Sequence, residues 1–544
     1  MACDFEMPLY DRKDDDMRRI SLTRIAALTL SIAMLLTACS APGAGGDSKG
    51  SDPAANSGET TYKTELNVAI NANPPSMDPH GINSNTVGGI GMHIYEPLFS
   101  LNANYEPVPV LAEGYTVSDD GLVYTITLRQ GVKFHNGQEM TADDVVASMN
   151  LWLERCSKAQ LIAGSTFAKV DDYTVTLTVP QASSDIIMVL AAPIQFAAIY
   201  PQSVAEAAGP DGISEYIGTG PYELAEWKQD QYVKLTRFAD YQSPEGEASG
   251  LVGEKSAATE TIYFRVVADN STQIAGLQTG QYDIVEGVPL EYYEDLSSDN
   301  NLELVVETGG TLNLFFNTTQ GPLANETLRQ AVLAALNCDD ILLAAYGDPN
   351  LYTLDPGWCP PDDAVWGSEA GSEYYNQNDP DKAKELLEQA GYDGEPIVLV
   401  TTPDYSEMYN ATLVVQEQLK QAGFNAEVEQ YDFSTFMEHR SNPDQYDLFI
   451  TSNSYNPLPV QLSVLSQDWA GLSAPEVTEG IAAIRGAATT EEASAAWDEL
   501  QGFLYEYGAA TVLGHYTGVY GMQAGVEGFD YMRYPIYWNV KVPE

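Results

Sequence analysis

Basic residues are scarce in this sequence. Lysine and arginine together number 25 in 544 residues, against 78 aspartates and glutamates, so the formal net charge at pH 7 is −53. Proteins that bind nucleic acid need many basic side chains to neutralise its phosphates. Nucleic acid is therefore excluded as a partner. The excess of carboxylates predicts a well-hydrated surface, and a weak preference for cationic solutes is the alternative.

Cysteine and histidine are also rare, with five residues of each type. Beyond residue 39 the chain keeps Cys156, Cys338 and Cys359, and an odd number this small is not typical of a disulfide framework. A pair between Cys338 and Cys359 is a hypothesis that an oxidising compartment would allow. The histidines show no i, i+4 spacing and no Cys-x-x-Cys motif is present, so we predict no metal site and no cofactor.

The sequence has one long apolar run, and it lies near the N terminus. Arg18, Arg19 and Arg24 precede the run Ile25–Leu36, which is shorter than the ~20 apolar residues that a membrane-spanning helix needs. Basic residues followed by a short apolar run are typical of an export signal that is removed from the mature protein. We therefore predict a signal peptide over residues 1–38 and a soluble body after it.

The end of this region predicts lipidation. Residues 36–39 read Leu-Thr-Ala-Cys and resemble the lipobox of bacterial lipoproteins, in which cleavage leaves the cysteine as an acylated first residue. Cys39 would then anchor the protein to the outer face of a cell membrane, whereas a plain secretory signal cut near Ala38 is the alternative. Three aspartates at residues 14–16 place negative charge where a signal needs positive charge, so Met17 is the preferred start.

Small and polar residues dominate the segment after Cys39. Glycine, alanine, serine, proline and aspartate fill residues 40–61 without apolar periodicity. A chain of this composition cannot bury enough apolar surface to fold. We predict a flexible tether over residues 39–63, which would hold the folded body near a membrane. The remaining length, about 480 residues, is too great for one small core and predicts two or more lobes.

Alternation of apolar and polar residues predicts half-buried strands in the first half of the body. They are Glu65–Ile70, Leu122–Leu128 and Tyr173–Val179. Thr141 stands three residues before Asp144 at the start of an apolar run, which is the pattern of a capping box. A helix is therefore predicted from Thr141 to about Glu154.

Predicted helices and strands alternate in the second half of the body. Asn325 is expected to cap a helix over Thr327–Leu336, and Asp379-Pro380 to open a helix that Gly391 ends. The elements that follow are a strand Ile397–Thr401, a helix ending at Gly423, and strands Asn425–Tyr431 and Asp447–Thr451. This β-α-β-α-β order predicts a mostly parallel sheet covered by helices.

Several motifs occur in the order in which one known family carries them. They are SMDPH at 76–80, IYEPL at 94–98, LAE at 111–113, DDGL at 119–122, LRQGVKFHNG at 128–137, TADDV at 141–145, GTGPY at 218–222, FNT at 316–318 and LRQA at 328–331. The chain resembles the extracellular solute-binding proteins, family 5, which serve dipeptide, oligopeptide and nickel ABC importers. The likeness extends from about residue 65 to the C terminus.

This resemblance implies an α/β fold of the periplasmic-binding-protein type, class II and the enlarged cluster C type, with two lobes joined by a hinge. Lobe I would span residues 64–310 with an extra subdomain at about 100–217, lobe II would span 311–513, and 514–544 would return to lobe I. Such lobes can close around a solute. We expect a monomer that presents its solute to ABC permease and ATPase subunits, at the cell surface or in a periplasm.

One departure from the family pattern bears on the solute. Peptide-binding members place an acidic residue shortly after a Tyr-Asp pair, where it holds the peptide ammonium by a charge-assisted hydrogen bond. Here Tyr446-Asp447 is followed by amides and hydroxyls at 452–457, and Phe315 stands where some peptide binders carry a carboxylate. An uncharged clamp suits a neutral solute or a peptide whose amine is blocked. The alternative is that Asp468 takes the anchoring role.

The predicted solute contacts carry amide, hydroxyl or aromatic side chains, which suit hydrogen bonding and stacking. They are Asn83, Ser84 and Asn85 of lobe I, Phe315, Asn453, Ser454, Tyr455 and Asn456 of lobe II, and Trp358 and Trp469 as aromatic walls. A peptide or peptide-like solute is favoured. An oligosaccharide, a metal chelate or haem is the alternative.

Motifs of the common enzyme classes are absent from the sequence. We find no Gly-x-Ser-x-Gly, no His-Glu-x-x-His and no phosphate loop. Residues 218–220 read Gly-Thr-Gly, but they lack the strand-to-helix pattern of a nucleotide site. We therefore do not expect an enzyme. An extracytoplasmic hydrolase and a sensory or adhesive lipoprotein are the alternatives from other functional classes.

Overall fold

The computed structural model describes residues 60–82, 84–361, 363–466, 472 and 474–544. Two units are distinguished by their internal contacts, residues 1–59 and residues 60–544. The architecture that follows is that of the second unit. The predicted signal peptide, Cys39 and most of the predicted tether lie outside the described residues.

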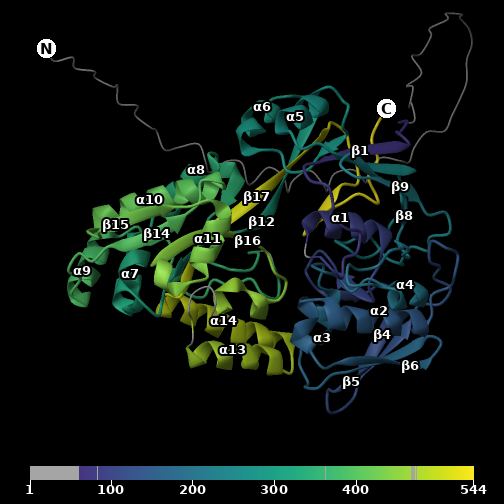
Figure 1. Ribbon diagram of the computed structural model, residues 1–544, viewed down its shortest axis with the longest axis horizontal. Coiled ribbons are helices and arrows are strands. Elements are labelled where there is room, and N and C mark those ends of the chain that lie inside the picture. The colour runs from purple at the N-terminus through teal and green to yellow at the C-terminus, as the bar shows by residue number, and fades with distance from the viewer. Residues whose placement is uncertain (1–59, 83, 362, 467–471, 473) are drawn as a thin grey trace, which may run out of the picture. The chain divides into compact units, whose positions relative to one another are not determined.

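A sheet of 11 strands, counted over the described residues, runs through this unit (Figure 1). Its strands are β1 (Glu65–Ile70), β8 (Tyr222–Lys228), β9 (Tyr232–Arg237), β10 (Thr261–Val266), β11 (Ile284–Val285), β12 (Leu302–Phe316), β13 (Tyr352–Thr353), β14 (Ile397–Thr401), β15 (Ala426–Gln430), β16 (Leu448–Ser454) and β17 (Ala510–Gln523). The order is β15-β14-β16-β12-β17-β11-β1-β10-β9-β8, and β13 pairs with β17 beside this path.

The sheet is mixed, which corrects the expectation of a mostly parallel sheet. β14 pairs in parallel with β15 and β16, as the β-α-β-α-β order predicts. However, β12 pairs antiparallel with both β16 and β17. Strands joined by a crossover helix pair in parallel, whereas β12 and β17 come from outside this alternating segment and are free to run the other way.

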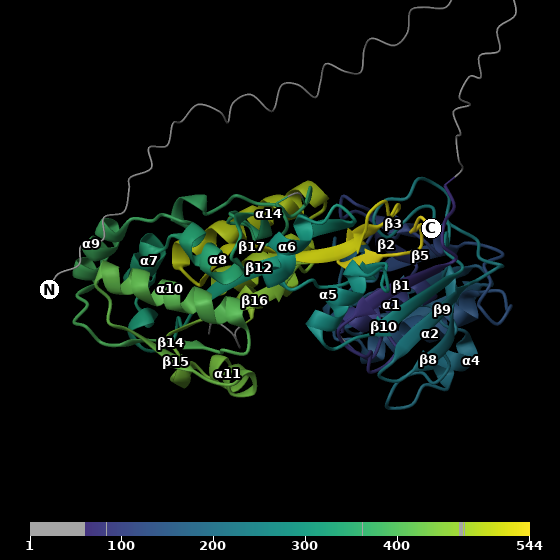
Figure 2. The ribbon, with the colours of Figure 1, turned by 90° about the horizontal axis from the view of Figure 1, so that it is seen from above.

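Strands β12 and β17 are the longest in the sheet and lie side by side (Figures 1 and 2). Their pairing extends from Leu302 opposite Gln523 to Phe315 opposite Ala510, with register shifts near Gly310. A Cβ atom on Gly310 would lie 2.0 Å from the carbonyl oxygen of Asn453 on β16. Glycine is therefore required where the three strands come together.

A second sheet of four antiparallel strands is separate from the first. It consists of β4 (Ala112–Val117), β5 (Val123–Leu128), β7 (Thr174–Thr178) and β6 (Thr166–Asp171), in this order. Helix α2 (Ala142–Arg155) lies in the same region and begins with the predicted capping box, in which Oδ2 of Asp144 accepts a hydrogen bond from the Thr141 amide at 2.8 Å. The strands and the helix predicted for this part of the chain are confirmed. Two hairpins are separate from both of these sheets. They are β2 (Phe99–Leu101) with β3 (Pro107–Pro109), and β18 (Asp530–Met532) with β19 (Tyr534–Ile536).

The described residues form twelve further α-helices. They are α1 (Asn85–Ile94), α3 (Ile186–Ala191), α4 (Gln202–Glu206), α5 (Asn270–Gln278), α6 (Tyr293–Ser297), α7 (Glu326–Ala335), α8 (Cys338–Tyr346), α9 (Pro380–Ala390), α10 (Ser406–Ala422), α11 (Phe433–Arg440), α13 (Pro475–Gly486) and α14 (Thr490–Tyr507). Asn325 caps α7, and Gly391 ends α9 in the left-handed conformation, so both predicted helix limits are confirmed.

Two hydrophobic clusters form the core of the unit. One contains buried side chains of β1, α1 to α4, β5, β7, β9 and β10, together with residues 522–542 near the C terminus. The other contains those of α5 to α11, α13 and α14 with β12, β14, β16 and part of β17. Each large apolar side chain that is fully buried stabilises the fold by roughly 1.5–3 kcal/mol.

The hypothesis of a disulfide between Cys338 and Cys359 is wrong, because both are free thiols. Spacing along the chain does not bring two Cα atoms within the ~7 Å that a disulfide requires. Burial raises the pKa of Cys338 to about 12 and that of Cys359 well above its ordinary value. Both thiols therefore stay protonated and pack in the hydrophobic core.

The two ends of the described unit lie together. The Glu544 amide donates a hydrogen bond to the Thr61 carbonyl at 3.0 Å, and the Lys63 amide donates to the Val542 carbonyl at 2.8 Å. Tyr62 forms an antiparallel bridge with Pro543. Residues 61–63 and 542–544 therefore form a short strand-like pair.

Candidate functional site

The first group of predicted contacts lies at the start of helix α1. Asn83 is outside the described residues. Ser84 caps the helix, and its hydroxyl accepts a hydrogen bond from the Val87 amide at 3.5 Å. Asn85 begins the helix with an exposed side chain, and its Oδ1 accepts a hydrogen bond from Nη2 of Arg533 at 3.2 Å. Amides of the first helical turn favour a negative or acceptor group nearby.

The second group lies at the end of β16 and just beyond it. Oδ1 of Asn453 accepts a hydrogen bond from Nδ2 of Asn313 at 2.9 Å. Ser454 is exposed at the last position of the strand. Asn456 is half-buried, and its Oδ1 accepts a hydrogen bond from the Leu458 amide at 3.1 Å. Each asparagine keeps further amide atoms that a solute could use.

Tyr455 joins a buried polar chain within this second group. It is 8% exposed, and its hydroxyl is hydrogen-bonded to Nδ1 of His515 on β17. Nε2 of His515 lies 3.4 Å from Oδ1 of Asp355. The chain fixes the tyrosine ring against β17, so Tyr455 serves as a wall rather than as a free hydroxyl.

Phe315 and Trp358 belong to the core, which corrects the expectation that they reach a solute. Phe315 is 0% exposed and stacks on Phe449 with ring centroids 5.1 Å apart. Trp358 is 3% exposed and packs on Tyr505 at 4.9 Å. The face of a strand to which a side chain points depends on register, and a resemblance in sequence does not fix it. Trp469 and Asp468 lie outside the described residues.

Three predicted contacts meet around Arg533, a residue that the sequence analysis missed. A cavity of about 200 Å³ is lined by Asn85 and Arg533 together with Glu286, Tyr520 and Tyr531. A second space, of about 20 Å³, is lined by Arg533 together with Tyr455 and Asn456. Arg533 thus connects the start of α1 with the segment after β16.

The backbone of Arg533 adopts an unusual conformation between strands β18 and β19. Its φ angle is 64°, in the left-handed region that disfavours a residue with a Cβ atom. Its guanidinium carbon lies 5.5 Å from the ring centroid of Tyr534. Nε is buried, and no described residue accepts a hydrogen bond from it. Neither a positive φ nor a contact with Asn85 at the other end of the chain can be read from a local sequence pattern.

Glu286 is a carboxylate on the wall of the larger of these two spaces. The Tyr537 hydroxyl donates a hydrogen bond to its Oε1 at 2.7 Å. Desolvation raises the pKa of Glu286 to about 7, although the bond from Tyr537 acts in the opposite direction. The group is therefore divided between its neutral and its charged form near neutral pH.

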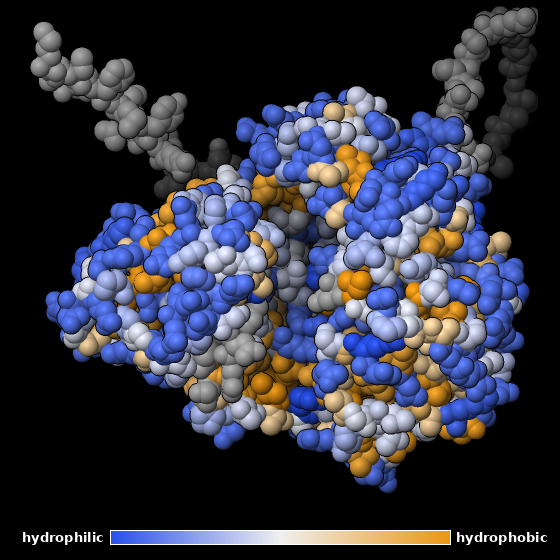
Figure 3. All heavy atoms as spheres, viewed as in Figure 1, coloured by the Kyte–Doolittle hydropathy of each residue, from blue (hydrophilic) through white to orange (hydrophobic). Residues whose placement is uncertain are grey.

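A groove lies on the face of the unit where the elements that carry the residues near Arg533 meet. Figure 3 shows a deep hollow between the region of α10 and α11 and the region of α1. The residues near Arg533 come from β1, α1, the segment after β11, β17 and the last hairpin on one side and from the segment after β16 on the other. A solute in this place would therefore contact chain segments that are far apart in sequence.

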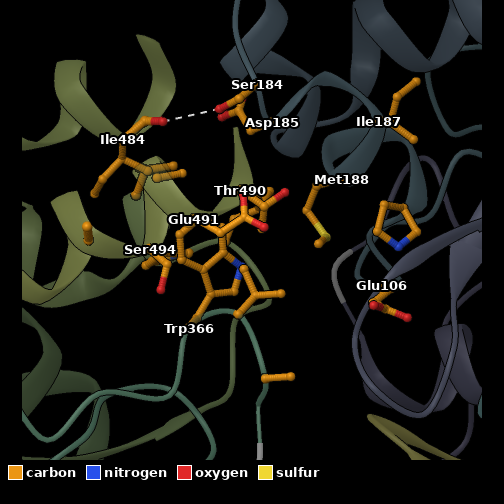
Figure 4. A pocket seen from close by; sticks show the side chains of 18 of the residues that line it. Glu106, Ser184, Asp185, Ile187, Met188, Trp366, Ile484, Thr490, Glu491 and Ser494 are labelled. Atoms are coloured by element: carbon orange, nitrogen blue, oxygen red, sulfur yellow. Dashed lines mark hydrogen bonds between the residues drawn. The ribbon is translucent and has the colours of Figure 1, made fainter. Parts of the chain in front are cut away.

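A larger cavity, of about 770 Å³, lies between α3, β4 and β5 on one side and α13 and α14 on the other (Figure 4). Met188, Ile187 and Trp366 give it an apolar wall, and Glu106 and Glu491 give it acidic edges. None of the predicted contacts that the structure describes lines it. Residues 364–366 and 458–460 line this cavity, and their neighbours 360, 363 and 455–457 line the small space at Arg533.

Hydrogen bonds beside the larger cavity connect two distant segments. The Ser184 amide donates to the Arg485 carbonyl at 3.0 Å, and the Ser184 hydroxyl donates to the Ile484 carbonyl at 3.2 Å (Figure 4). Nε of Arg485 pairs with Oδ2 of Asp185 at 3.1 Å, and Nη2 donates to the Leu161 carbonyl at 2.7 Å. These contacts join the predicted extra subdomain to predicted lobe II.

Gly218, His80 and His93 lie in or beside the family motifs, and their surroundings indicate roles in packing. A Cβ atom on Gly218 would lie 2.0 Å from the Ile94 carbonyl oxygen, so this glycine allows two backbones to approach closely. Burial lowers the pKa of His80 to about 4 and that of His93 to about 3, so both rings are neutral. Among the described residues, no three His, Cys, Asp or Glu side chains are grouped as metal ligands.

Among the described residues, no helix combines the length and the apolar character that crossing a membrane requires.

Comparison with known proteins identifies the family. A model described as bacterial extracellular solute-binding proteins, family 5 Middle, matches residues 106–468. The glutathione-binding protein GsiB of Salmonella typhi is 35% identical over 373 residues, which are 67% of this chain and 69% of that protein. The probable peptide ABC transporter periplasmic-binding protein y4tO of Sinorhizobium fredii is 30% identical over 374 residues, 66% of this chain and 70% of that protein.

A solved structure supports the same assignment at the level of the fold. The dipeptide-binding protein from Pseudoalteromonas sp. SM9913, in complex with Met-Leu, has a TM-score of 0.68 and 21% sequence identity. The alignment covers 88% of this chain and 100% of that one. With the family model matched over most of the folded unit, this chain belongs to the bacterial extracellular solute-binding proteins, family 5.

Proposed function

We propose that this chain is the substrate-binding subunit of an ABC importer and captures a peptide or a peptide-like solute. The observation that carries the proposal is the meeting of Asn85, Tyr455 and Asn456 around Arg533. A solute placed there would touch both ends of the folded unit, which suits capture by closure. Two relatives are named for glutathione and for peptide, and this supports the class of solute.

The lobes of this subunit would be those that the sequence suggests. Lobe I would consist of residues 64–310 and 514–544, with an extra subdomain at about 100–217, and lobe II of residues 311–513. Strands β12 and β17 would carry the hinge, because both are long and pair along most of their length. The monomeric subunit would hand its solute, chemically unchanged, to permease and ATPase subunits.

The first test is equilibrium binding by calorimetry with glutathione and with Met-Leu. We expect at least one of them to bind with a Kd of about 1 µM or lower and to be recovered unchanged. Asn456→Ala should weaken binding by about fivefold, the worth of one ordinary hydrogen bond, while Asn301→Ala, exposed at the start of β12, should not. Absence of heat for both solutes, or turnover of either, would contradict the proposal.

We further propose that the contacts after β16 form an uncharged clamp. Asn453, Ser454 and Asn456 carry amides and a hydroxyl, and no described residue from 452 to 457 is acidic. Acetyl-Met-Leu should then bind within about threefold of Met-Leu, because the free amine has no charged partner in this segment. A loss above about tenfold would mean that a carboxylate, Glu286 or Asp468, holds the amine.

We propose in addition that Cys39 carries a lipid that anchors the subunit on the extracytoplasmic face of the membrane. The motif at residues 36–39 supports this. Cys39→Ser should move the protein from the membrane fraction to the soluble fraction of expressing cells, whereas the matched control Ser40→Ala should not. Mass spectrometry of the N-terminal peptide should show an acylated Cys39 in the unaltered chain. An unmodified Cys39 would contradict the proposal.

A further inference from the structure

We propose that Arg533 binds a carboxylate of the solute, so that this subunit selects peptides or peptide-like acids over the matching amides. The inference rests on the proposed function and names the chemical class that the site prefers. Arg533 lines both spaces at the candidate site, and Asn85, Tyr455 and Asn456 surround it.

The guanidinium of Arg533 can donate hydrogen bonds to a solute. It carries five N–H groups in a fixed fork that matches a carboxylate. Nη2 donates to Oδ1 of Asn85 at 3.2 Å, and the buried Nε has no acceptor among the residues described. A solute carboxylate could accept from the remaining donors in a bidentate arrangement.

No carboxylate that the structure describes forms an ion pair with Arg533. Among the ion pairs of the described residues, none includes Arg533, although acidic side chains outnumber basic ones 78 to 25 in the chain. Glu286 lines the larger space and accepts a hydrogen bond from the Tyr537 hydroxyl at 2.7 Å, and Asp363 lines the smaller space, but neither carboxylate forms an ion pair with Arg533. A partly buried cation without a counter-charge favours an anionic ligand.

A second cation lies close to this position. Nζ of Lys158 donates to Oε1 of Gln461 at 3.0 Å, and the backbone oxygen of Gln461 accepts from Nδ2 of Asn456 at 3.4 Å. Burial lowers the pKa of Lys158, and the charge of Arg533 adds to this effect. The two cations therefore act on each other, and an anion between the lobes would relieve their repulsion.

Neutral donors surround the cation. Burial raises the pKa values of Tyr520 and Tyr531, so both hydroxyls stay protonated and can donate hydrogen bonds. Helix α1 begins at Asn85 and adds the partial positive charge of its first turn. These groups would stabilise a carboxylate that the guanidinium holds.

The backbone conformation of Arg533 independently supports a role for its side chain. A residue at φ 64° would usually be glycine, because glycine has no Cβ atom to clash. An arginine in this conformation is unfavourable for folding and is explained if its side chain has a role in the groove.

The test is calorimetry on the full chain with two matched pairs of probes, Met-Leu with Met-Leu amide and glutathione with its glycine amide. The unaltered protein should prefer each acid over its amide by about tenfold or more. Arg533→Gln should abolish this preference by weakening the acids, and Arg533→Lys should restore part of it, because lysine keeps the charge but not the fork. Arg265→Gln, on β10 and not among the residues that line either space, should leave both affinities unchanged.

A second variant separates folding from binding. Arg533→Gly relieves the backbone, so it should melt at the same or a higher temperature and still lose the preference for acids. Equal binding of acid and amide by the unaltered protein would overturn the inference and leave the proposed function standing. An unchanged preference in Arg533→Gln would do the same.

If none of the four probes binds, the proposal that the solute is a peptide is contradicted. The inference about Arg533 is then tested on the solutes that purify with the protein. Mass spectrometry after denaturation should find a solute with a carboxylate in the unaltered chain and much less of it in Arg533→Gln. A neutral or cationic solute, or one retained equally by the variant, would overturn the inference.

Discussion

Glu286 is a single residue whose surroundings make stability depend on pH. Its pKa is raised from 4.5 to about 7 by desolvation. As pH rises from about 4.5 to about 7, the unfolded chain releases this proton before the native state does, so the native state binds more protons in that window. The free energy of unfolding therefore falls across it, by about 1–3 kcal/mol when partial exposure is discounted.

Glu286→Gln should remove this fall in the free energy of unfolding. Glutamine keeps an acceptor for the Tyr537 hydroxyl but cannot ionise. We expect the variant to melt at a higher temperature than the unaltered protein at about pH 8 and at a similar temperature at about pH 4.5. Thermal unfolding over this range, with the exposed Glu303→Gln on β12 as the control, measures the effect. An equal shift at both pH values would show that packing, not ionisation, is responsible.

At the scale of residues, the sequence located part of the candidate site. Asn85 and Asn456 were placed by the resemblance, and the structure brings both to Arg533. Their role as solute contacts stays a prediction. Phe315 and Trp358 were misplaced, because burial on a strand or in a loop depends on packing partners far along the chain. Arg533 itself was missed, since its backbone conformation and its distant partner leave no local signal.

Helix α13 contacts the segment before α3, and this contact between elements is the one most suited to control closure of the lobes. Arg485 of α13 pairs with Asp185, which is 6% exposed, and its carbonyl accepts hydrogen bonds from Ser183 and Ser184. These contacts would exist only while the two predicted lobes are together. They should therefore stabilise the closed form that holds the solute.

Arg485→Ala should open this contact and weaken solute binding. Removing the guanidinium leaves the buried Asp185 with the Ser183 hydroxyl but without a cationic partner, which costs about 1–2 kcal/mol and corresponds to a Kd roughly 5–30 times higher. Calorimetry gives the Kd, and X-ray scattering without solute should show a larger radius of gyration. Lys169→Ala, which breaks an exposed pair with Asp143 inside the predicted subdomain, is the control. An unchanged Kd would show that the contact does not act on closure.

Elements were predictable where their signals are local. Thr141 with Asp144, Asn325, and Asp379 with Gly391 define helix limits within a few residues of chain, and the structure confirms them. The lengths and directions of β12 and β17 were not predictable in this way. Their pairing joins residues about 200 positions apart, and such contacts depend on the whole fold.

The charge of the whole molecule, −53 at pH 7, opposes its compact state through self-repulsion. Screening by salt should relieve it, because the Debye length falls from about 14 Å at 0.05 M to about 4 Å at 0.5 M. We expect the melting temperature to rise by several degrees over this range of NaCl. Sucrose at the same osmolality controls for solvent exclusion. A melting temperature that falls or stays constant would show that the carboxylates are already well separated.

The pairing of residues 61–63 with 542–544 has a practical consequence for the whole molecule. Because the two ends touch, a short Gly-Ser linker can join them, and new ends can be opened at an exposed loop such as that of Gly394. A circularly permuted chain of this kind would keep every strand of the large sheet. Carrying a fluorescent protein at its new ends, it would become an optical sensor of lobe closure in living cells.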